Sequence, residues 1–154
     1  MAAADINALA FDFFREFARC EYCLKAVGLR KKGRDAKASW GAFAGEVREV
    51  LETPKSAEMK AAVEYYLAKP PKKQIVENGF LDWDMKLPDH KHQAELILRL
   101  VGSVRNNLFH GGKFNGRWFE PQRSEELLTY GLVVLRACIE AHPRVREAYE
   151  HRAV

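Results

Sequence analysis

One short segment of the sequence gathers residue types that can bind a phosphate and move a proton. Arg105, Asn106 and His110 lie near the end of a helical pattern, and Lys113 follows the paired glycines at 111–112. An arginine fork matches phosphate oxygens, and an asparagine can orient its neighbours through hydrogen bonds. A histidine changes its protonation near neutral pH and can act as a general acid or base. The cluster therefore indicates an anion site with acid–base capacity, beside glycines that free the backbone to turn close to a ligand.

The same residues also have a simpler interpretation. A histidine at the C-terminal end of a helix is often only a favourable partner of the helix dipole. The sequence offers no acidic cluster for magnesium beside this segment and no Gly-x-x-x-x-Gly-Lys loop for a nucleoside triphosphate. We therefore expect no metal ion and no cofactor, and the residues alone leave catalysis and helix stabilisation both open.

The cysteines and the other histidines have structural interpretations. The chain contains three cysteines, Cys20, Cys23 and Cys138, and an odd number argues against a disulfide framework. Cys20-x-x-Cys23 would be half of a zinc site, but a second pair is missing, so we interpret both as small residues on one side of a helix. His90 and His92 stand at a helix start, and we expect them to be solvated rather than metal-bound.

Length and charge set the broad class. The 154 residues suit a single domain spanning 1–154, and the net charge of +4 permits an anionic partner without indicating one. The basic segment 29–34 is either a solvated loop or a patch that contacts phosphates. No apolar run approaches the ~20 residues of a membrane span, and the N-terminus lacks the features of a secretory signal. We expect a cytoplasmic protein that does not enter a membrane.

The elements that must position the cluster are helices. Apolar residues recur at spacings of three and four, as on the buried face of an amphipathic helix. The pattern predicts helices over 5–27, 38–51, 56–69, 89–108, 124–141 and 145–149. Asn78-Gly79 between short apolar runs predicts a small β-hairpin or tight turn over 74–83, and Asn115-Gly116 a second small turn. The expected fold is an all-α bundle of up-and-down helices with one or two short hairpins or turns.

Individual residues set the helix ends and faces in this prediction. Asp5, Ser56 and Ser124 are expected to cap helix starts, and Gly28 to end the first helix in the left-handed conformation. The expected buried residues include the aromatic group Phe13, Phe14 and Phe17, the group Met59, Val63, Tyr66 and Leu67, and the stripe Gln93, Ile97, Leu100, Val101, Val104 and Leu108.

The segment from Arg105 to His110, Arg-Asn-Asn-Leu-Phe-His, resembles the Arg-polar-x-x-x-His motif of the HEPN superfamily of small helical domains. The context is similar, since the motif ends one long helix and precedes another. The resemblance implies a metal-independent endoribonuclease, in which the 2′-hydroxyl of RNA attacks the adjacent phosphate and leaves a 2′,3′-cyclic phosphate. His110 would be the general base or acid, Arg105 would stabilise the phosphorane, Asn106 would hold the geometry, and Lys113 is a further candidate for phosphate binding.

The resemblance also implies partners. The reaction needs a proton acceptor and a proton donor, and HEPN proteins meet this need by dimerising around one cleft. A homodimer with a composite site, an RNA substrate, and an antitoxin or defence protein are therefore the expected partners. One HEPN toxin subgroup carries a modified tyrosine two residues after the histidine, where this chain has Gly112, which puts that regulation in doubt.

Two alternatives stay open at this point. The chain could be a non-catalytic HEPN-like module that binds RNA, a nucleotide or a protein, because a fold does not determine its use. Arg105 and His110 could also only stabilise a helix end, in which case both side chains should be committed to internal hydrogen bonds.

Overall fold

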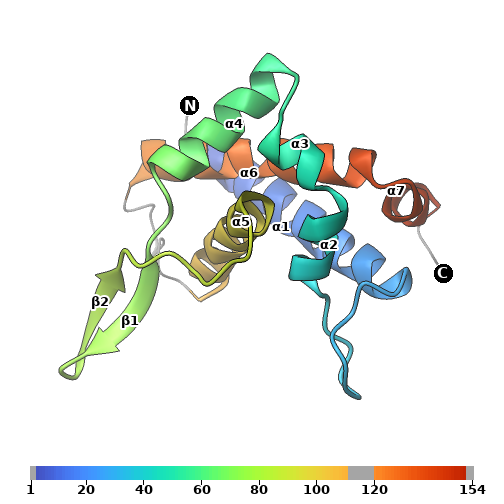
Figure 1. The fold of residues 1–154 in the computed structure, drawn as a ribbon. Helices are drawn as coiled ribbons and strands as arrows, with labels where there is room; N and C mark the ends of the chain where they lie inside the picture. Colours follow the sequence, from blue (N-terminus) through green and yellow to red (C-terminus); the bar gives the residue numbers. More distant parts are fainter. Residues whose placement is uncertain (1–2, 111–119, 152–154) are drawn as a thin grey trace.

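The computed structural model describes residues 3–110 and 120–151, with side chains described from residue 5 onward. Helices contain 67% of the described residues, which confirms the expected all-α class. They are α1 (Ala3–Ala26), α2 (Trp40–Glu46), α3 (Arg48–Glu52), α4 (Ala57–Ala68), α5 (Gln93–Phe109), α6 (Pro121–Ala141) and α7 (Pro143–Glu150) (Figure 1). None of these helices combines the length and the apolar character that a membrane span requires.

The helices pack in two groups around one core. Helix α6 packs against α1, α4 and α7, and α5 lies in front of it and packs against α2 and α3 (Figure 1). The stripe predicted for α5 is confirmed at Ile97, Leu100, Val101 and Val104, which are buried, whereas Gln93 and Leu108 at its two ends are half-buried. Burial of these side chains anchors α5, so its C-terminal end has a defined place in the bundle.

Two predicted helix ends are confirmed. The Ser56 hydroxyl accepts a hydrogen bond from the Met59 amide at 3.0 Å, and Gly28 follows α1 with a φ of +92°. Glycine adopts that left-handed conformation without the steric cost that a Cβ would add.

Two predicted caps are wrong. Helix α1 begins at Ala3, so Asp5 lies within its first turn. Helix α6 begins at Pro121, and Ser124 is a buried residue inside it. Proline suits the first helical position because its φ is already helical and its missing N–H would have no partner there.

The single helix predicted over 38–51 is also wrong, because the chain bends at Val47 between α2 and α3. Val47 has a φ of −116° and a ψ of +24°, outside the helical region, although its amide still bonds to the Phe43 carbonyl at 3.1 Å. On either side of the bend, Phe43 and Leu51 are fully buried. The bend lets both short helices pack against α5, a tertiary contact that outweighs local helix continuity.

Two predicted core residues differ as well. Phe13 and Phe17 are buried, but Phe14 is 40% exposed and stacks on Phe109 instead. Leu67, placed inward on α4 by the sequence pattern, is also 40% exposed. Both residues lie at the edge of the apolar stripe of their helix. How far the buried face extends around each helix depends on which neighbouring helices cover it.

The Asn-Gly segment forms the predicted hairpin. Strand β1 (Lys73–Glu77) pairs antiparallel with β2 (Phe80–Asp84), and Asn78 and Gly79 have φ values of +51° and +80°. Positive φ at both turn residues is what a tight two-residue hairpin requires. The hairpin projects from the bundle near the C-terminal end of α5 (Figure 1). The second predicted turn, at 115–116, lies outside the described residues.

Candidate functional site

Helix α5 arranges the candidate residues by its own geometry. At 3.6 residues per turn, positions 99, 103, 106 and 110 fall on one face of a helix. Asn106 and His110 therefore lie one above the other, with the His110 amide donating to the Asn106 carbonyl at 2.9 Å. His110 is the residue that ends α5, which places its ring at the C-terminal, negative end of the helix dipole.

Arg105 comes from the adjacent side of α5 and reaches the same place through its long side chain. Its Nη1 donates to Asn106 Oδ1 at 3.1 Å, and its guanidinium carbon lies 4.7 Å from the centroid of the Phe109 ring. The Phe109 ring also stands edge-on to the His110 ring, with 5.3 Å between centroids. The structure thus brings together Arg105, Asn106 and His110, as the sequence predicts.

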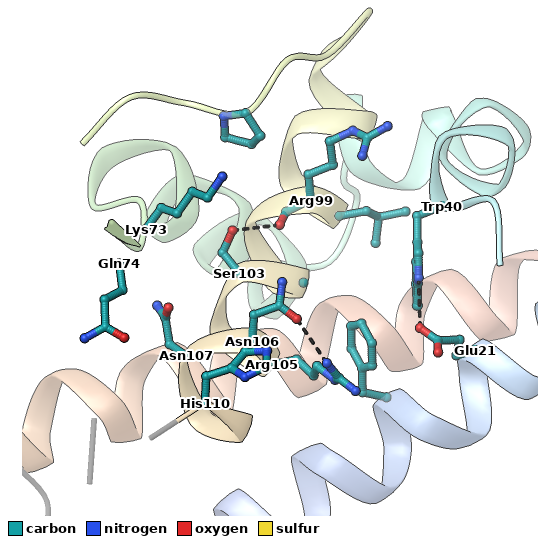
Figure 2. Close-up of a pocket in the computed structure, with 14 residues that line it drawn as sticks. Glu21, Trp40, Lys73, Gln74, Arg99, Ser103, Arg105, Asn106, Asn107 and His110 are labelled. Carbon is teal, nitrogen blue, oxygen red and sulfur yellow. Dashed lines mark hydrogen bonds between the residues drawn. The ribbon is translucent and has the colours of Figure 1, made fainter. Parts of the chain in front are cut away.

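These three residues line one end of a pocket of about 620 Å³, here called the α5 pocket (Figure 2). Its wall combines polar groups of α5 with residues from α1, α2 and β1. The lining residues are Phe17, Glu21, Trp40, Lys73, Gln74, Pro88, Leu98, Arg99, Gly102, Ser103, Arg105, Asn106, Asn107 and His110.

The charges of the α5 pocket favour an anion. Lys73, Arg99 and Arg105 supply positive charge, and the carboxylate among the lining residues belongs to Glu21. That carboxylate accepts a hydrogen bond from Trp40 Nε1 at 3.3 Å. Charges of one sign gathered in a cleft attract ligands of the other sign.

The His110 side chain lies exposed at the α5 pocket. It forms no hydrogen bond with any residue in the described ranges. Among the described residues, Arg105 makes the internal hydrogen bond that the purely structural interpretation of this helix end expects, and His110 makes none. Lys113, the further phosphate-binding candidate, lies outside the described residues.

The other histidines have different surroundings. His142 is buried, with its Nε2 2.8 Å from Glu46 Oε1 and its Nδ1 accepting from the Val145 amide, so it holds the start of α7. His92 is not simply solvated as predicted, because its Nδ1 accepts from the Glu95 amide at 3.2 Å and caps α5. His90 is exposed on the segment before that cap, as expected.

The three cysteines are buried and form no disulfide. Burial raises the pKa of the Cys20, Cys23 and Cys138 thiols, so they stay protonated and unreactive at neutral pH. Within the described ranges, no group of three or more potential ligand side chains could hold a metal ion.

Sequence reasoning missed most residues of the pocket wall, among them Arg99, Ser103, Lys73 and Trp40. Arg99 and Ser103 precede Asn106 by seven and three residues, so the helical period alone could have placed them on the same face. Lys73 and Trp40 come from β1 and α2, and only the tertiary packing brings them to α5.

The comparisons with known proteins add no family to this description. No protein-family model matches the chain, and no curated protein or solved structure is significantly similar to it.

Proposed function

We propose that the protein is a metal-independent endoribonuclease of the HEPN type. The observation that carries this proposal is the meeting of Arg105, Asn106 and His110 at one end of a cationic pocket. These side chains offer charge stabilisation and proton transfer to a phosphodiester, and neither role requires a metal ion. HEPN domains serve in bacterial defence, stress and toxin–antitoxin systems, and we propose a role of that kind.

The reaction follows from the groups that the pocket presents. The 2′-oxygen of a ribose forms a bond to the adjacent phosphorus, and the bond from phosphorus to the 5′-oxygen of the next nucleotide breaks. A general base takes the proton of the 2′-hydroxyl, and a general acid gives a proton to the departing 5′-oxygen. The products are a 2′,3′-cyclic phosphate and a 5′-hydroxyl, so atoms and charges balance without a cofactor.

Each residue has one role in this scheme. The exposed His110 ring transfers a proton, and the Arg105 guanidinium stabilises the negative charge that builds on the phosphorane. The contact of Asn106 Oδ1 with Arg105 holds the guanidinium at the pocket. Because one histidine cannot be base and acid at the same moment, the second proton-transfer group comes from a second copy of the chain in a composite site.

An exposed aromatic surface beside the site supports such a dimer. Phe11, Phe14 and Phe109 are 62%, 40% and 59% exposed, and Phe14 stacks on Phe109 with 6.3 Å between ring centroids. Contiguous exposed apolar side chains mark interaction surfaces. This surface, here called the aromatic surface, adjoins Arg105 through Phe109, so a copy seated on it would reach the pocket.

The test is RNA cleavage by the purified protein in EDTA. We expect cleavage with 2′,3′-cyclic phosphate ends, and a loss of about 10²- to 10⁴-fold in rate for His110→Ala, the range typical of general acid–base groups. Arg105→Ala should cost about 10²- to 10³-fold, as for removal of a charge-stabilising donor.

His90→Ala is the matched control, because His90 is exposed and lies outside the pocket lining. It should cleave at the wild-type rate. RNA binding without cleavage by the wild type would favour the non-catalytic binding module. Equal cleavage by wild type and His110→Ala would overturn the assignment of the site.

A further inference from the structure

The α5 pocket extends beyond Arg105, Asn106 and His110. A second pocket of about 450 Å³, here called the side pocket, shares Trp40 and Arg99 with it. The charged residues that line the side pocket besides Arg99 are Lys31, Lys91 and Glu95. The two pockets therefore meet at Trp40 and Arg99, and the side pocket extends from there to Lys31 of the basic loop 30–34.

That loop is positively charged and shaped by its own backbone. Arg30, Lys31, Lys32 and Arg34 are all exposed. The Lys31 amide donates to the Lys37 carbonyl at 2.9 Å, and Arg30 forms an isolated bridge with Ala38. The loop backbone is therefore held at the edge of the side pocket, where Lys31 forms part of the pocket wall.

Arg99 stands at the junction of the two pockets and has donors to spare. Its Nη2 donates to Glu95 Oε2 at 2.8 Å, while its Nε is buried and has no hydrogen-bond partner among the described residues. Glu95 is itself held, because its other oxygen accepts from the Lys91 amide at 2.7 Å. These two contacts, the Lys91 amide first, lower the pKa of Glu95 and keep it charged. Glu95 thus positions the Arg99 guanidinium.

The dimensions of the two adjoining pockets favour a polymer over a single nucleotide. From Arg99 to His110 the helix rises about 16 Å at ~1.5 Å per residue. A stacked strand advances about 3.4 Å per nucleotide, so this stretch alone corresponds to roughly five nucleotides. A pocket of about 620 Å³ has the size of a small-molecule site, so it holds only part of such a strand and the rest of the strand lies beyond it.

We infer that a single-stranded RNA runs along α5 from Arg105 and His110, past Arg99, to the basic loop. The inference rests on the proposed function for its choice of ribonucleic acid. Phosphates lie beside Arg99 and Lys31. The Trp40 ring lies at the junction and is stacked on Phe17, with 4.8 Å between ring centroids. The scissile bond lies at one end of the bound strand, so RNA length determines affinity.

The experiment measures binding without cleavage. A 2′-O-methyl RNA cannot undergo attack by its 2′-oxygen, and its affinity is followed by fluorescence anisotropy over a range of salt concentrations. We expect a decanucleotide to bind more tightly than a dinucleotide. Lys31→Ala and Arg99→Gln should each weaken decanucleotide binding and lower the slope of log affinity against log salt by about 0.7, the value for one phosphate contact of a single strand.

The control is Lys60→Ala, because Lys60 is an exposed lysine of α4 that lines neither pocket. It should bind like the wild type. Lys31 lies on an exposed loop, so its variant keeps the test valid even where Arg99→Gln unfolds the protein by releasing Glu95. Dinucleotide binding should be unchanged in Lys31→Ala.

The outcomes separate this inference from the proposed function. Equal affinity for the two RNA lengths, no binding of either, or equal behaviour of Lys31→Ala and Lys60→Ala would overturn the RNA path. Length-dependent binding by a protein that never cleaves RNA would uphold the path and overturn the nuclease.

Discussion

Two neighbouring asparagines of α5 show how one helix divides its side chains between structure and site. Asn106 is exposed, lines the α5 pocket and accepts from Arg105. Asn107 is buried, and its Nδ2 donates to the Lys72 carbonyl at 2.9 Å. Successive residues are about 100° apart around a helix, so both asparagines reach the pocket wall, but only the buried Asn107 amide is committed to the base of the hairpin.

The two asparagines should therefore respond differently to the same change. Asn107→Ala removes the donor of a buried hydrogen bond and should lower the free energy of unfolding by roughly 1–2 kcal/mol. Asn106→Ala should change it by less than ~0.5 kcal/mol, as an exposed substitution, but slow RNA cleavage up to about 100-fold by releasing Arg105. Urea unfolding and cleavage rates measured on both variants check this. Loss of stability in Asn106→Ala, with slower cleavage but unchanged stability in Asn107→Ala, would contradict these roles.

At the scale of elements, a close approach of three helices sets the core. Gly131 of α6 faces α1 and α4, where a Cβ would lie 2.7 Å from Phe13 Cε2 and 2.8 Å from the Tyr66 hydroxyl. That hydroxyl donates to the Leu127 carbonyl at 2.7 Å, so it cannot move away without losing a buried hydrogen bond. The absence of a side chain at this glycine lets the helices approach.

A pair of glycine substitutions tests this packing. Gly131→Ala should lower the free energy of unfolding by about 1–3 kcal/mol through overpacking, reduced by the better helix propensity of alanine. Gly102→Ala, inside α5 with no atom within 4 Å of the added Cβ, should instead raise it by up to ~1 kcal/mol. Thermal unfolding of both proteins is the measurement. Equal stabilisation by both substitutions would show that the helices are not closely packed at Gly131.

At the scale of the whole molecule, the proposed reaction needs a second chain. The aromatic surface adjoins the site, whereas the equally apolar Phe80 is 76% exposed at the far end of the hairpin. Substitutions of Phe11, on the aromatic surface, and of Phe80, on the hairpin, therefore distinguish a specific dimer interface from a general effect of exposed apolar side chains.

Light scattering should give a mass of twice 17.6 kDa for the wild type. Phe11→Asp should shift the protein toward the single-chain mass and lower RNA cleavage in parallel, because a carboxylate would be buried in the interface. Phe80→Asp should change neither property. A single-chain protein that cleaves RNA at the full rate would rule out the composite site.

The sequence by itself determined the features that depend on near neighbours. The apolar spacing predicts the helices, Asn78-Gly79 predicts the hairpin, and the positions of Arg105, Asn106 and His110 place three site residues at one helix end. Each follows from the 3.6-residue period of a helix or from turn chemistry, which act over a few residues.

The tertiary structure decided what depends on contacts between distant segments. The bend at Val47 and the exposure of Phe14 follow from how neighbouring helices pack. Lys73 and Trp40 join the pocket of Arg99 only because β1 and α2 lie against α5. Both residues are far from α5 in the sequence, so helical periodicity could not place them beside it. The free energy that brings these segments together comes from burial of the whole core rather than from any local preference.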